Sequence, residues 1–202
     1  MTEPADRDDV EEPVPPLTRD RLLDMAGQVF ADEGYASVSV RDLARRSSLT
    51  TGAIYAHFLN KADLLVEAID ARVDAGVETS RDIETTFKDY LEGVGARIGD
   101  RTQLRALLVE GAAAARSDPA VRERLHHEQV RRLDSWVGEY EAGQATGELD
   151  PAVDMRAAVM MLWAIELGLG VLEAFAIESP DPDAWADLTR RFVESIEAPQ
   201  EP

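Results

Sequence analysis

One short segment, residues 39–61, gathers the side chains that could contact a polyanion. It carries a net charge of +3, with Asp42 as its single acid. Its basic residues are Arg41, Arg45, Arg46 and Lys61. Guanidinium and ammonium groups bind phosphate, and small or hydroxyl residues let a helix approach base edges in the major groove. Such residues lie between the basic ones: Thr50, Thr51, Gly52 and Ala53. The segment therefore predicts contact with double-stranded DNA.

The rest of the chain is acidic. Its 202 residues include 21 Lys and Arg against 40 Asp and Glu, for a net charge of −19. Residues 1–16 carry −5 and residues 62–202 carry −15, whereas residues 17–61 carry +1. An acidic surface repels nucleic acid, so DNA binding must depend on the few basic side chains of residues 39–61.

Enzyme classes find little support in the residue types. The chain has no cysteine, which excludes a thiol nucleophile, a disulfide scaffold and cysteine metal sites. There is no G-x-S-x-G, no P-loop and no H-E-x-x-H, and the Glu-x-x-His spacing at Glu123 and His126 occurs once where a carboxylate metal bundle needs two. We expect no catalytic residues, no metal and no cofactor. A helical-bundle enzyme is kept as the alternative from another class.

The elements that would position the basic segment are all helices. Alternating β-branched strands and Asn-Gly or Asp-Gly hairpin turns are missing from the sequence. Capping residues predict the first four helices, beginning after Thr18, Ser39, Thr50 and Asn60. These helices would span residues 18–33, with Gly34 as the left-handed C-terminal residue, then 40–47, 51–57 and 61–77.

Asp-Pro pairs predict helix starts in the second half, because proline is tolerated at the first helical position and the preceding carboxylate caps it. The pairs are Asp118-Pro119, Asp150-Pro151 and Asp181-Pro182. Further helices are expected near 80–99, 102–116, 119–144, 151–178 and 182–197. The fold class is therefore all-α, with about nine helices.

Two short helices with a tight turn and basic flanks suit a helix–turn–helix. On periodicity alone this pattern is weak, because short amphipathic helices are common. Apolar residues of the region are expected in the core, namely Phe30, Val40, Leu43, Ile54 and Phe58. Tyr55 is left open between a phosphate contact and a core tyrosine, and Arg46 between a DNA contact and a solvated side chain.

The region Leu17–Val66 resembles the DNA-binding region of the TetR family of bacterial transcriptional regulators. The resemblance rests on Phe30-Ala31-x-x-Gly34-Tyr35, on Ser39–Ala44 and on Gly52–Phe58, followed by Lys61 and Leu64-Leu65. It implies an N-terminal DNA-binding domain over residues 17–62, a helical ligand-binding and dimerisation domain over 63–202, and a disordered acidic arm over 1–16. One departure is Ser48, which stands in the turn where the family usually has glycine.

The resemblance also implies roles for individual residues. Arg41 and Arg45 would touch the DNA backbone from the second helix, and the third helix would be the recognition helix. Tyr55, His57 and Lys61 match positions that usually contact phosphate. The protein is then expected to be a transcriptional regulator, a repressor released from a palindromic operator by a small-molecule effector. A ligand-independent DNA-binding protein is the alternative.

An almost wholly apolar stretch, residues 157–177, predicts a homodimer. A helix that is apolar all round must be covered on both faces, and the family pairs its last two helices in a four-helix interface. Gly168 and Gly170 would allow close approach. The expected interface residues are Trp163, Leu167, Gly168, Val171, Trp185, Leu188, Phe192 and Ile196.

An effector pocket is expected in the second domain because members of the family usually sense a small molecule there. Its candidate lining is Phe87, Tyr90, Leu107, Trp136, Tyr140, Met160, Trp163 and Glu166. The same aromatic pattern also fits an ordinary core. Glu166, which interrupts the apolar run, could bind a cationic ligand or lie at the dimer rim.

No membrane or export signal is apparent. The N-terminus lacks a basic region followed by an apolar one, so it is not a secretory signal. Carboxylates within residues 157–177 make a membrane span unfavourable. We therefore expect a cytoplasmic protein with no membrane partner.

Overall fold

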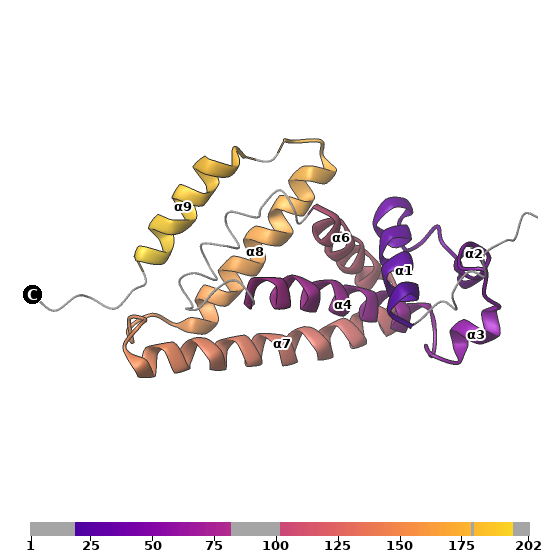
Figure 1. The fold of residues 1–202 in the computed structure, drawn as a ribbon, viewed down its shortest axis with the longest axis horizontal. Helices are drawn as coiled ribbons and strands as arrows, with labels where there is room; N and C mark the ends of the chain where they lie inside the picture. Colours follow the sequence, from indigo (N-terminus) through magenta and orange to yellow (C-terminus); the bar gives the residue numbers. More distant parts are fainter. Residues whose placement is uncertain (1–18, 82–101, 179, 196–202) are drawn as a thin grey trace, which may run out of the picture.

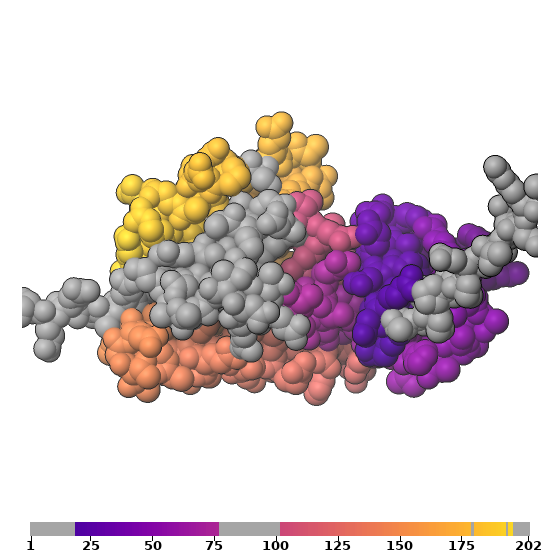
Figure 2. All heavy atoms as spheres, viewed as in Figure 1, coloured from indigo at the N-terminus to yellow at the C-terminus, as the bar shows by residue number. Residues whose placement is uncertain are grey.

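The computed structural model describes residues 19–81, 102–178 and 180–195, and these residues form eight helices. The N-terminal four are α1 (Arg19–Glu33), α2 (Val40–Arg46), α3 (Thr51–Tyr55) and α4 (Lys61–Arg81). The others are α6 (Thr102–Ser117), α7 (Pro119–Thr146), α8 (Met155–Ala174) and α9 (Pro182–Glu194). The all-α prediction is confirmed, and α2 and α3 lie at one end of the molecule while α8 and α9 lie at the other (Figure 1, with all heavy atoms in Figure 2).

Helix starts follow the capping residues in most places. Asp118 accepts hydrogen bonds from the backbone amides of Ala120 and Val121, and Pro119 opens α7. Asp181 caps α9 through the amide of Ala184, at 3.0 Å. The starts predicted at the first and third Asp-Pro pairs are therefore correct.

The start predicted at Asp150 is wrong. Residues 150–153 form a turn in which Asp150 accepts from the amide of Ala152, and the side chain of Gln144 donates to two carbonyls of that turn. Helix α8 begins only at Met155, where Asp154 caps it through the amide of Ala157. Because Pro151 lies in this turn, Asp154, four residues after Asp150, caps the helix instead.

Several predicted helix ends also move. Helix α4 continues to Arg81 instead of ending near Val77, and the remainder of the helix predicted at 80–99 lies outside the described residues. Helix α8 ends at Ala174 and α9 at Glu194, both earlier than predicted. Helix α7 continues to Thr146, where Gly147 ends it with a left-handed φ of 82°.

The main core joins the N-terminal helices to α6 and α7. Leu22 and Phe30 of α1 pack in one cluster with Leu64 and Ile69 of α4 and Leu107 of α6. Helix α4 thus begins beside α3 and packs against α1, α6 and α7. One continuous cluster therefore joins α6 and α7 to the first helices.

A second, smaller cluster lies between α7 and α8. Its buried members are Leu133, Tyr140, Leu149, Met155 and Val159. Trp136 and Trp163 pack against it edge to face, with ring centroids 5.6 Å apart. One face of α8 remains exposed, although the helix also packs against α6.

Candidate nucleic-acid interface

The turn between α2 and α3 is tightly defined. A capping box opens α2: Asp42 donates its backbone amide to the Ser39 hydroxyl and accepts from the Ser39 amide through its carboxylate. Thr50 caps α3 by accepting from the amide of Ala53 at 3.1 Å. Between them Ser48 has a φ of 56°, the left-handed conformation that glycine adopts without strain. The departure from the family pattern at Ser48 therefore places a residue with a side chain in a strained backbone conformation.

Buried side chains fix which face of α3 is exposed. Ile54 and Phe58 are 1% exposed and belong to the main core, as do the other residues predicted there, Phe30, Val40 and Leu43. The side chains of Thr51, Tyr55 and His57 face solvent, and Tyr55 is 53% exposed. A core role for Tyr55 is thereby excluded. His57 lies in the turn after α3, so the helix predicted to reach it is two residues shorter.

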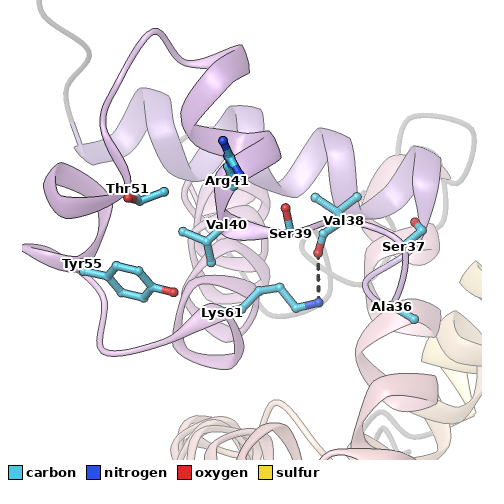
Figure 3. Close-up of a pocket in the computed structure, with 9 residues that line it drawn as sticks. All are labelled: Ala36, Ser37, Val38, Ser39, Val40, Arg41, Thr51, Tyr55 and Lys61. Atoms are coloured by element: carbon cyan, nitrogen blue, oxygen red, sulfur yellow. Dashed lines mark hydrogen bonds between the residues drawn. The ribbon is translucent and has the colours of Figure 1, made fainter.

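An open hollow of about 520 Å³ lies between the α1–α2 loop, the start of α2 and α3 (Figure 3). It is lined by residues 36–41 together with Thr51, Tyr55 and Lys61. Tyr55 and Thr51 approach it from α3, and Lys61 crosses it from the start of α4 (Figure 3). Hydroxyls and two cations thus gather on a single concave surface, which is the composition that contacts a DNA phosphate backbone.

Lys61 has a structural role that the sequence did not indicate. Its Nζ donates to the backbone oxygens of Tyr35 at 2.8 Å and Val38 at 3.0 Å, and it lies 3.9 Å from the centre of the Tyr35 ring. Burial lowers the pKa of Lys61, and the nearby carboxylate of Asp118 opposes that effect. Two of its three N–H groups therefore hold the α1–α2 loop.

The three arginines of α2 differ in their pairing. Arg46 is exposed, as the solvated alternative expects, and its guanidinium forms an ion pair with Glu33 of α1, which lowers the pKa of that carboxyl. Arg45 pairs with Asp42 at 2.9 Å. Arg41 is exposed, lines the hollow and makes no ion pair with the described residues. Of the three arginines, only Arg41 could bind a phosphate without giving up an ion pair to another described residue.

The residues predicted to line an effector pocket are not all brought together. Trp136, Tyr140 and Trp163 do meet at the second cluster. Leu107 instead lies in the main core beside Gly27, and Met160 is 55% exposed, so neither belongs to a common lining with them. Phe87 and Tyr90 lie outside the described residues.

Glu166 faces a cation that the sequence analysis missed. Its Oε2 lies 3.6 Å from Nη1 of Arg105, a fully buried side chain on α6. Glu173, further along α8, binds the same guanidinium through both of its carboxylate oxygens. No local pattern pointed to Arg105, because an arginine within an amphipathic helix ordinarily faces water.

The residues predicted for a dimer interface are distributed over α8 and α9. Leu167, Gly168, Val171 and Leu188 are exposed, and Trp185 and Phe192 are half-buried. Trp163 turns toward Trp136 within the protomer, and Ile196 lies outside the described residues.

The two glycines of α8, Gly168 and Gly170, differ in how closely other atoms approach them. A methyl group at Gly168 would meet no described atom within 4 Å, whereas one at Gly170 would lie 3.0 Å from Val109 and 3.1 Å from the backbone oxygen of Arg105. Gly170 therefore allows α8 to approach α6 inside the protomer, which corrects its predicted role between subunits.

Comparison with known proteins agrees with this geometry. Residues 22–68 match the model for bacterial regulatory proteins of the tetR family. The chain is 31% identical over 194 residues to the HTH-type transcriptional regulator ArpR of Pseudomonas putida, covering 84% of this chain and 88% of that one. It is 27% identical over 158 residues to UidR of Escherichia coli (strain K12), covering 77% and 80%, and 26% identical over 164 residues to the repressor KstR2 of Rhodococcus jostii, covering 71% and 74%.

Solved structures show the same fold. Salmonella enterica GusR superposes with a TM-score of 0.70 at 27% identity, covering 92% of this chain and 97% of that one. At lower identity the fold alone is shared with FadR of Bacillus subtilis in complex with stearoyl-CoA, which has a TM-score of 0.67 at 20% identity and covers 85% and 95%. It is also shared with a Saccharomonospora viridis regulator in complex with choline, with a TM-score of 0.60 at 19% identity and coverages of 89% and 97%.

Helix α3 is exposed, is held by the turn that follows α2, and lies beside a cationic hollow, while the rest of the chain is helical. Together these features define a helix–turn–helix DNA-binding transcriptional regulator and not an enzyme. The chain belongs to the TetR family of bacterial regulatory proteins.

Proposed function

We propose that the protein is a cytoplasmic repressor that binds a palindromic operator as a homodimer and leaves it when a small molecule binds the second domain. Membership of the TetR family establishes DNA binding and transcriptional regulation. Operator symmetry, dimerisation and effector release are the parts that are proposed here.

The hollow beside α3 is the observation that carries the DNA-binding geometry. Thr51 and Gly52 open α3 and are exposed, so the N-terminal end of α3 can enter a major groove without obstruction. Arg41, Tyr55 and Lys61 flank that end and suit the phosphates on either side. Base contacts are assigned to Thr51 with Gly52 and Ala53, and backbone contacts to Arg41, Arg45, Tyr55, His57 and Lys61.

The uncovered face of α8 supports the homodimer. By length and hydropathy this helix is apolar enough to cross a membrane. Even so, only 11% of its most apolar 18-residue window is buried within the chain. Helix α9 also carries an exposed apolar side chain, Leu188, which is 60% exposed. An exposed apolar helix face of this kind marks an interface, and a twofold dimer presents two α3 helices to two half-sites about one DNA turn apart.

An effector is supported by the relatives and by the polar groups of α8. Homologous structures hold ligands as different as choline and stearoyl-CoA, so the fold does not select the ligand. In this chain Trp136, Tyr140, Trp163 and Glu166 are the remaining candidates for the lining. Glu166 already faces Arg105, so it is the aromatic faces that favour a cationic effector, through cation–π contacts.

Three measurements on the full chain test the proposal. Duplexes selected from a random-sequence pool should converge on an inverted repeat, and sedimentation at micromolar concentration should give about twice the 22.2 kDa chain mass. A thermal-shift screen of organic cations should find a compound that raises the melting temperature and lowers affinity for the selected duplex. An asymmetric site with a clean monomer would overturn the dimer, and binders that leave DNA affinity unchanged would favour the ligand-independent alternative.

A further inference from the structure

Tyr35, in the loop between α1 and α2, is bound to the second part of the molecule. Its hydroxyl donates to Oδ2 of Asp118 at 2.9 Å, and its backbone amide donates to Oε2 of Glu110 at 2.9 Å. Glu110 belongs to α6 and Asp118 is the first capping residue of α7. The loop is therefore held at the corner where α6 and α7 meet.

The same tyrosine is also held from the DNA-binding side. The Lys61 ammonium lies 3.9 Å from the centre of the Tyr35 ring, and it donates hydrogen bonds to the backbone carbonyls of Tyr35 and Val38. Figure 3 shows Lys61 reaching Val38 across the hollow. Residues 36–41, which follow Tyr35 directly, form one wall of that hollow. The position of Tyr35 therefore sets the position of the wall.

Asp118 divides its two carboxylate oxygens between two tasks. Oδ1 accepts from the amides of Ala120 and Val121 and so fixes the start of α7, while Oδ2 accepts from Tyr35. The hydrogen bond from Tyr35 lowers the pKa of Asp118, so the carboxylate is charged at neutral pH. A displacement of the α6–α7 corner must either move the loop or break this charge-assisted bond.

We propose that Asp118, a residue of the second domain, is a positioning residue for DNA binding, which acts through Tyr35 and Lys61 to hold the wall of the DNA-facing hollow. The link is a direct polar path between the two parts of the chain, in addition to the packed core around α4. It rests on DNA binding alone and requires neither an effector nor a dimer.

The first test compares two hydroxyl deletions in the full chain. Tyr35→Phe removes the bond to Asp118 but keeps the ring beside Lys61 and its contact with Phe30, at 5.7 Å between centroids. Its affinity for a duplex selected by the wild type should fall by about three- to ten-fold. Thr146→Val is the matched control, because it removes a hydroxyl that donates to the Gly143 oxygen at the C-terminal end of α7, and it should bind as the wild type does.

The second test is a double-mutant cycle with Asp118→Ser. Serine is a good helix cap, so α7 keeps its start, but its short side chain cannot also accept from Tyr35. The single variants and the double variant should lose the same affinity, because each breaks the same bond. Wild-type affinity in both single variants, or losses that add in the double variant, would overturn the proposal.

Amide hydrogen exchange provides a readout that a purely stabilising role would not move. When the selected duplex is added, exchange at the amides of Ala120 and Val121 should slow in the wild type and stay unchanged in Tyr35→Phe, since binding energies of linked sites are reciprocal. Unchanged exchange at these amides in the wild type would contradict the link. If Asp118→Ser failed to fold, the comparison of Tyr35→Phe with Thr146→Val would still decide the question.

Discussion

The guanidinium of Arg105 on α6 is bound by both carboxylate oxygens of Glu173 on α8, with its Nε 3.0 Å from each oxygen, and Arg105 has no exposed surface. Gly170 makes this possible, because α8 approaches the backbone of Arg105 too closely there for an ordinary side chain. The pair joins the two helices that lie between the DNA-binding end and the proposed dimer face.

Removing one partner of this buried pair should be costly. Glu173→Gln should lower the free energy of unfolding by about 3 kcal/mol, because it leaves a desolvated cation with a weaker partner. Urea unfolding at fixed protein concentration measures the change. The control is Asp134→Asn, whose partner Arg156 lies 3.0 Å away with both side chains more than half exposed, and it should cost less than about 1 kcal/mol. Equal losses in the two variants would contradict the assignment.

Salt dependence should distinguish the arginines of α2. Arg41→Gln should weaken binding to every duplex and reduce the slope of log affinity against log salt by about one unit, because its free guanidinium is assigned to a phosphate. Arg46→Gln should change the slope less, since Arg46 is engaged by Glu33. Fluorescence anisotropy across a salt series gives both slopes. A larger change for Arg46 than for Arg41 would reverse the assignment.

Two neighbouring threonines should behave differently. Thr51→Ala should change base preference more than overall affinity, because Thr51 is exposed at the end of α3 that enters the groove. Thr50→Ala should instead destabilise α3 by about 1 kcal/mol and weaken binding to all sequences alike, because its hydroxyl caps the helix. Selection of duplexes by each variant checks this. An altered consensus for Thr50→Ala with none for Thr51→Ala would refute it.

A charge on the apolar face of α9 should separate the subunits. Leu188→Glu places a carboxylate in the proposed interface and should shift sedimentation toward the monomer mass. Val130→Glu is the matched control, since Val130 is also an exposed apolar residue but lies on α7, and it should leave the dimer intact. An unchanged dimer in Leu188→Glu would remove α9 from the interface.

Alkaline pH should expose the contribution of Tyr35. Burial and the bond to Asp118 raise the pKa of Tyr35 well above its ordinary value of about 10. Above about pH 10 the unfolded chain loses a proton that the folded chain retains, so the free energy of unfolding must fall as pH rises. Tyr35→Phe should show a shallower fall in urea unfolding at a series of pH values. Parallel curves would mean that Tyr35 ionises equally in both states.

The amino-acid sequence alone determined the features that depend on neighbours along the chain. Caps at Ser39, Thr50 and Asp118 define helix starts because the groups that satisfy one another are two or three residues apart. The spacing of Ile54 and Phe58 likewise separates the buried face of the helix–turn–helix from the face that meets DNA. The family and the exposed face of α3 followed from such local patterns, whereas the pattern at Asp150 gave a wrong helix start because Asp154 caps α8 instead.

Only the tertiary structure decided which charged groups are free and which are engaged. Lys61 and Tyr35 are 26 residues apart, Tyr35 and Asp118 are 83 apart, and Arg105 and Glu173 are 68 apart. No periodicity relates residues at such separations, since their contact depends on how the helices pack. For that reason the sequence could name Lys61 as a cation near DNA but could not reveal that it also holds the loop, nor that Gly170 faces α6 and not a second subunit.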